Sequence, residues 1–125
     1  WIVEGKDRLD DATVALAEAA ASEGLLRLSA LSMWEVGMLE ARGRIRFDLP
    51  CLEWVEKALG LPGLSLVPLT PSIAVNSSRL PGDFHGDPAD RIIVATTRAV
   101  GGLLITRDER IIDYAGAGYL RTARI

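Results

Sequence analysis

The chain alternates between two kinds of segment that differ in how their apolar residues are spaced. Short segments rich in leucine, isoleucine and valine predict strands, and apolar positions three or four residues apart predict amphipathic helices between them. The predicted strands cover residues 25–29, 64–69, 102–106 and 119–125. The predicted helices cover residues 12–22, 51–59, 72–79 and 88–100, a helix from 29 or 32 to 42, and a short helix from 108 or 109 to 114. Because strands and helices alternate, the pattern predicts an α/β sandwich with a mainly parallel sheet.

Capping residues mark several of these helix ends. Thr70-Pro71 and Asp87-Pro88 each place a good N-cap residue before a proline at the first helical position. Ser29 or Ser32 is expected to open the second helix, and Gly43 to supply the left-handed position after its end. With 125 residues, the chain is expected to form a single domain, residues 1–125.

Charge and cysteine content restrict the classes of function. Fourteen basic and seventeen acidic residues give a net charge of −3, so nucleic acid would have to be held by a local patch or a bound metal. The one cysteine, Cys51, forms neither a disulfide framework nor a thiolate metal site, which fits a reducing cytoplasm. No apolar run approaches the ~18 residues of a membrane span, so we expect no membrane insertion.

Two aspartates stand where a metal site is expected in such a fold. Asp90 lies in the first turns of the helix predicted over 88–100, and Asp108 follows the strand predicted over 102–106. Ligands of open parallel sheets bind beyond the carboxyl ends of the strands. Mg²⁺ and Mn²⁺ prefer oxygen ligands, and converging carboxylates suit phosphodiester cleavage. With Glu35 as a third candidate, the sequence indicates a metal-dependent nuclease.

Each candidate also has an ordinary structural interpretation. Asp87 is the expected N-cap, and Asp90 three residues later is a possible capping-box partner. Asp108 is a possible cap of the short helix that follows, and Glu35 is expected in a first helical turn, where the helix dipole favours negative charge. The sequence leaves both interpretations open for all of these carboxylates.

Neighbouring residues add weaker candidates. Thr106 is placed to support a carboxylate, or is a strand-end residue without a chemical role. His85, the sole histidine, is interpreted as a loop residue, with contact to substrate as the alternative. Arginine forks suit phosphate groups, so Arg91 and Arg107 are candidate substrate contacts. The alternative for the arginine-rich composition is the codon bias of a GC-rich genome.

The residues around these candidates resemble the PIN-domain family, and closely the VapC-type toxin ribonucleases of toxin–antitoxin pairs. The similar stretches cover residues 28–35, 43–45, 80–93 and 104–108, including Asp87-Pro88-Ala89-Asp90-Arg91. The resemblance implies a three-layer α/β/α sandwich in which Glu35, Asp90 and Asp108 hold Mg²⁺ or Mn²⁺, with Thr106 and Asp87 supporting the site. It further implies endonucleolytic cleavage of RNA, a cognate antitoxin as partner, and a cytoplasmic homodimer.

One feature of the family lacks a counterpart in the sequence given. PIN domains open with a central strand that ends in an aspartate, and Trp1 resembles the tryptophan that follows it. We therefore expect this strand and another carboxylate to lie upstream of Trp1. The alternative is a catalytically inert PIN-like module that binds RNA or a protein. A nuclease directed at DNA is a third possibility, because carboxylate–metal sites cleave either polymer.

Overall fold

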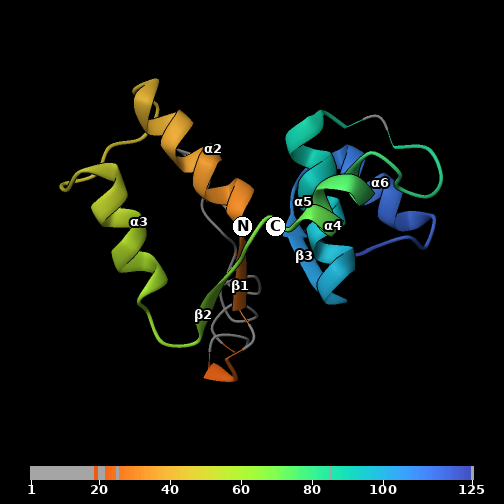
Figure 1. Ribbon diagram of the computed structural model, residues 1–125, viewed down its shortest axis with the longest axis horizontal. Coiled ribbons are helices and arrows are strands. Elements are labelled where there is room, and N and C mark those ends of the chain that lie inside the picture. The colour runs from red at the N-terminus through yellow and green to blue at the C-terminus, as the bar shows by residue number, and fades with distance from the viewer. Residues whose placement is uncertain (1–18, 20–21, 25, 85, 125) are drawn as a thin grey trace. The chain divides into compact units, whose positions relative to one another are not determined.

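The structure is a computed structural model that describes residues 19, 22–24, 26–84 and 86–124. The chain divides into two compact units that meet in sequence at Val67 and Pro68. We call them the N-terminal unit and the C-terminal unit and describe each by itself (Figure 1). The helix predicted over residues 12–22 lies almost entirely outside the described residues.

The N-terminal unit contains two strands and two helices in its described part. Their order is β1 (Leu26–Ser29), α2 (Ala30–Ala41), α3 (Cys51–Leu59) and β2 (Leu64–Val67). β1 and β2 pair in parallel, as the alternation of strands and helices predicts. Ser29, one of the two expected caps, opens α2 by accepting a hydrogen bond from the main-chain N–H of Leu31 at 3.2 Å. Gly43 has the predicted left-handed conformation, with φ of 71°.

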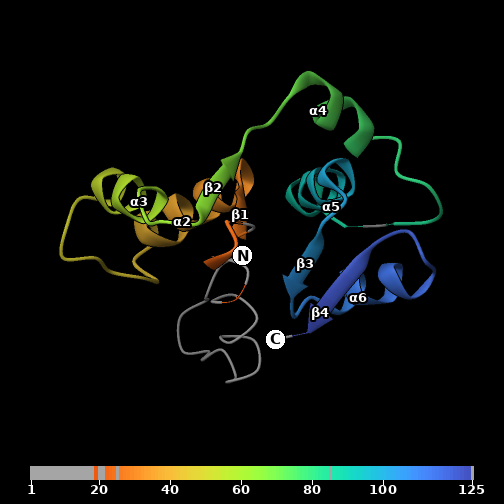
Figure 2. The ribbon, with the colours of Figure 1, turned by 90° about the horizontal axis from the view of Figure 1, so that it is seen from below.

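The C-terminal unit carries most of the candidate residues. Its elements are α4 (Pro71–Ser77), α5 (Pro88–Val100), β3 (Leu103–Thr106), α6 (Glu109–Gly116) and β4 (Arg121–Arg124). β3 and β4 pair in parallel and lie side by side in Figure 2. Both predicted N-caps are confirmed: Thr70, which precedes Pro71, caps α4, and Asp87, which precedes Pro88, caps α5.

A small core holds the C-terminal unit together. Its buried members come from the loop before α5, from α5, from α6 and from the segment before β4: Phe84, Val94, Ile111, Tyr114 and Leu120. The hydroxyl of Tyr114 donates a hydrogen bond to the main-chain oxygen of Pro81 at 2.7 Å. The pKa of Tyr114 is raised above its usual value, chiefly by burial. An exposed ion pair between Glu109 and Arg124 also joins the start of α6 to the end of β4.

The predicted fold class is confirmed, with differences in detail. Among the described residues the strands form two separate parallel pairs, β1–β2 and β3–β4, where the sequence predicted one sheet. The strands are slightly shorter than predicted, and α6 is longer. The placement of Glu35 in a first helical turn was wrong: because Ser29 and not Ser32 caps α2, Glu35 lies in the second turn. No helix in the described part of the chain is long and apolar enough to cross a membrane.

Candidate active site

The N-terminus of α5 positions Asp90. The side chain of Asp87 accepts a hydrogen bond from the main-chain N–H of Asp90 at 2.9 Å, which begins the helix in the way an N-cap residue does. Pro88 at the first helical position fixes the backbone there. Asp90 is thereby held at a defined place in the first turn of α5, where the helix dipole favours a negative charge.

Asp108 is held from both sides at the carboxyl end of β3. Thr106 Oγ1 accepts a hydrogen bond from the main-chain N–H of Asp108 at 3.1 Å. Asp108 Oδ1 in turn accepts from the N–H groups of Arg110 at 2.9 Å and Ile111 at 3.2 Å. Its interpretation as the cap of α6 is thus confirmed. Both capping bonds end on Oδ1, and this is compatible with a metal contact through the other oxygen.

The electrostatics of Asp90 show that these carboxyl groups act on one another. The pKa of Asp90 is raised from 3.8 to about 6, first by burial and then by the negative charges of Asp87 and Asp108. A hydrogen bond with the Asp87 side chain raises it further, while the guanidinium of Arg110 lowers it. Burial and the neighbouring negative charges thus both disfavour the ionised form of Asp90 in the metal-free protein.

A divalent cation fits this donor set. Carboxylate oxygens are the ligands that Mg²⁺ and Mn²⁺ prefer, and a bound cation would offset the repulsion that raises the pKa of Asp90. Asp90 and Asp108 are the two side chains of the C-terminal unit that would hold it. In neither unit do the described residues bring three or more His, Cys, Asp or Glu side chains into a metal-binding group.

Glu35 belongs to the N-terminal unit. It lies half-buried on α2, and it has an interaction partner within the structure. Its role as a third ligand stays a prediction.

Arg110 was missed by the sequence analysis. It lies on the exposed side of α6, and its charge acts on Asp90 across the two helices. The only signal in the sequence is its position two residues after Asp108, which does not by itself predict a neighbour on α5. The charge of Arg110 lowers the pKa of Asp90 and so favours its ionised form.

The structure describes two of the three predicted substrate contacts, Arg91 and Arg107. Arg91 donates from Nε to the main-chain oxygen of Ser77 at 2.8 Å and also bonds to the oxygen of Phe84. These contacts join the helix α5 to the end of α4 and to the loop before α5. A role of Arg91 in substrate binding stays a prediction. Arg107 is exposed and has an interaction within the structure. His85 lies outside the described residues.

Gly86 allows close packing behind Asp90. A Cβ atom at this position would lie 2.4 Å from a ring carbon of Phe84 and 3.1 Å from Cβ of Asp90. The Phe84 ring is buried in the core of the unit, so it has little room to move. Glycine at position 86 therefore lets the main chain pass close to both the buried Phe84 ring and Asp90.

We expect Gly86→Ala to lower the free energy of unfolding by about 1–3 kcal/mol, because the added methyl group overpacks the core. Thermal unfolding followed by circular dichroism measures the effect. Gly116→Ala is the matched control in the same unit, since no atom lies within 4 Å of its added Cβ. Equal stabilities of the two variants would contradict the packing role of Gly86.

Comparison with known proteins identifies the family of the chain. The family model described as "PIN domain" matches residues 1–117. Ribonuclease VapC22 of Mycobacterium tuberculosis (strain ATCC 25618 / H37Rv) is 34% identical over 99 residues, which cover 79% of this chain and 75% of that protein. The chain therefore belongs to the PIN-domain family and is of the VapC type.

Proposed function

We propose that this protein is the ribonuclease toxin of a toxin–antitoxin pair and cleaves RNA in a reaction that depends on Mg²⁺ or Mn²⁺. The observation that carries the proposal is the pair Asp90 and Asp108, whose mutual repulsion contributes to the raised pKa of Asp90. Carboxylates kept close at such an electrostatic cost are typical of functional sites. Family membership and the similarity to a VapC ribonuclease support the same reading.

In this proposal some residues bind the cation and others position the residues that bind it. Asp90 and Asp108 hold the cation, with Glu35 as the third proposed ligand. When bound, the cation supplies Lewis-acid chemistry at the phosphodiester. Thr106 and Asp87 are positioning residues, because they fix the main chain at Asp108 and Asp90. Arg110 holds Asp90 toward its charged form, the form that binds a cation.

The family also supports proposals about organisation. Because the PIN model runs through both units, we assign residues 1–125 to one PIN domain. A cognate antitoxin as inhibitor, a homodimer and a cytoplasmic location are the further parts of the proposal.

Metal removal tests the reaction directly. We expect a mixed pool of tRNA and rRNA to give discrete fragments in Mg²⁺ or Mn²⁺, and to stay intact in EDTA. Adding the metal back in excess should restore the same fragments, because the chelator removes only the cation. Fragments that persist in EDTA would contradict a metal-dependent reaction.

The inert module remains the second candidate. It is favoured by the finding that no group of three metal-binding side chains gathers within either unit, as far as the units are described. An inert module would bind RNA or a protein without cutting, so intact RNA in the presence of metal and folded protein would favour it. A nuclease directed at DNA would cut single-stranded DNA and leave the RNA pool intact.

A further inference from the structure

Charges in the C-terminal unit are segregated along the sequence. From Pro68 onward, every acidic residue falls within residues 83–90 or 108–113. The segments 68–82, 91–107 and 114–125 contain arginine as their only charged residue type. The unit therefore has an acidic part around the candidate metal site and other segments that are purely basic.

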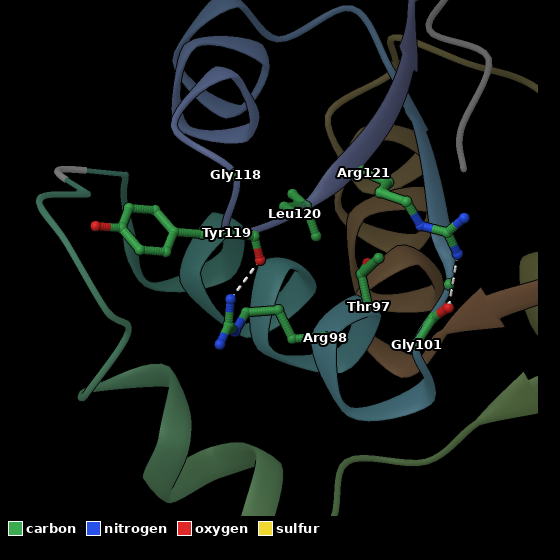
Figure 3. Close-up of a pocket in the computed structure, with 8 residues that line it drawn as sticks. Thr97, Arg98, Gly101, Gly118, Tyr119, Leu120 and Arg121 are labelled. Atoms are coloured by element: carbon green, nitrogen blue, oxygen red, sulfur yellow. Dashed lines mark hydrogen bonds between the residues drawn. The ribbon is translucent and has the colours of Figure 1, made fainter.

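Two of the basic segments meet at a shallow cavity of about 260 Å³. The cavity lies beyond the C-terminal end of α5, and Arg98 and Arg121 are among its lining residues. Figure 3 shows the two guanidinium groups on different sides of Thr97, and the ring of Tyr119 extending away from both. Arg98 donates to the main-chain oxygen of Tyr119, and Arg121 donates to that of Gly101 at 3.0 Å. Main-chain carbonyls thus hold both cationic groups in place.

A second cavity continues this surface toward α4. It has a volume of about 350 Å³ and is lined by Asn76, Arg79 and Ala95 together with Arg98. Because Arg98 lines both cavities, Arg79, Arg98 and Arg121 form one series, which we call the arginine groove. Among the described residues, no acidic side chain lines either cavity.

The arginine groove is suited to anions. A guanidinium carries five N–H donors, and the main-chain bond of Arg98 or Arg121 uses one of them. The remaining donors match the planar geometry of phosphate oxygens. All three arginines are exposed, so an anion can reach them without displacing the core.

We propose that the arginine groove binds phosphate groups in the backbone of the RNA substrate, away from the bond that is cut. The inference rests on the proposed function for its choice of RNA. Asp90 and Arg98 lie eight residues apart on α5, which is about 12 Å along the helix axis. A single strand leaving the carboxylates is therefore able to reach Arg98 within a few nucleotides.

RNA fits the groove better than an acidic protein segment does. The protein carries a net charge of −3 and its candidate site is acidic, so RNA needs a local cationic contact to stay bound. Three arginines along two adjoining cavities offer separate contacts to successive phosphates of one polyanion. The Tyr119 ring stacks on Tyr114, with centroids 5.1 Å apart, so one face of the ring is already occupied. Contacts of this kind position RNA without selecting its sequence.

Salt-dependent binding tests the groove. The affinity of a fluorescein-labelled single-stranded RNA for the metal-free protein in EDTA is measured by fluorescence anisotropy over a series of KCl concentrations. Arg79→Gln, Arg98→Gln and Arg121→Gln are each expected to weaken binding several-fold. Each should also reduce the slope of log affinity against log salt by about 0.7, the value for one phosphate contact in a single strand.

Matched variants separate the groove from net charge and from folding. Arg27→Gln removes the same charge from an exposed position of β1 that lines neither cavity, and we expect wild-type affinity and slope. Arg98→Lys keeps the charge and should keep the slope, although its hydrogen bond to Tyr119 changes. Melting temperatures from circular dichroism show that each variant is folded.

Several outcomes would overturn the inference. These are wild-type affinity and slope in all three groove variants, no RNA binding by the wild-type protein, or groove variants that lose binding of labelled polyglutamate while still binding RNA. If the wild-type protein cleaves RNA and the groove variants bind RNA as well as wild type does, the groove is not an RNA-binding site and the proposed function is unaffected. Groove-dependent binding without cleavage in metal supports the groove and rejects the ribonuclease.

Discussion

Asp90→Asn is expected to abolish RNA cleavage while making the metal-free protein more stable. Asparagine is close to aspartate in shape but lacks the charge that holds a divalent cation. We expect a loss of at least about 10³-fold in the cleavage rate, equivalent to about 4 kcal/mol in the activation free energy. Cleavage of labelled RNA in Mn²⁺ measures it, and wild-type activity in this variant would remove Asp90 from the site.

The stability gain follows from the raised pKa of Asp90. The charged carboxylate is disfavoured in the folded state, so the unfolded chain releases its proton near pH 3.8 and the folded chain only near pH 6. The contribution of this group to folding is therefore complete below pH 3.8 and is lost as the pH rises through 6. Because the group is partly exposed and screened, we expect a cost of about 1 kcal/mol at pH 7.5.

Melting of the two proteins at two pH values checks this effect. In EDTA at pH 7.5, Asp90→Asn should raise the melting temperature by about 3–5 °C. At pH 4 the difference should shrink toward zero, since the carboxyl group is then largely neutral in the folded state. A variant that melts below wild type at pH 7.5 would show that Asp90 stabilises the fold.

Replacements of Asp108 should separate its two tasks. Asparagine caps helices as well as aspartate does, so Asp108→Asn should lose cleavage and keep stability. Asp108→Ala should lose cleavage and also about 1 kcal/mol of stability, because the N–H groups of Arg110 and Ile111 lose their acceptor. Parallel cleavage assays and thermal melts measure both quantities. Full activity in Asp108→Asn would leave Asp108 with capping alone.

Local signals account for what the sequence predicted well. The cap-and-proline pairs at Thr70 and Asp87 depend on the geometry of a few adjacent residues, and both helices begin where the sequence placed them. The boundary of α2 was ambiguous because Ser29 and Ser32 are both good caps. Because of that ambiguity, the predicted position of Glu35 along the helix was wrong by about one turn.

Properties that depend on packing could not be predicted from the sequence. Asp90 and Asp108 were chosen as a pair from their positions at a helix start and a strand end. The influence of Arg110 on Asp90 needs the placement of α6 against α5. Position 86 requires glycine because a Cβ atom there would overlap the Phe84 ring. Neither contact leaves a periodic or spacing signal in the chain.

Under the proposed toxin function, the raised pKa of Asp90 has an evolutionary consequence. Most inactivating substitutions in an enzyme also weaken its fold, and cells then clear the product. Here the simplest escape from toxicity is a neutral residue at position 90, and the metal-free form of such a mutant is expected to be more stable than that of the active protein. Inactive copies of this gene should therefore persist as well-folded proteins that still bind the proposed antitoxin. Such copies would compete with active protein for the proposed antitoxin, so one inactive allele would raise the amount of antitoxin that a cell needs.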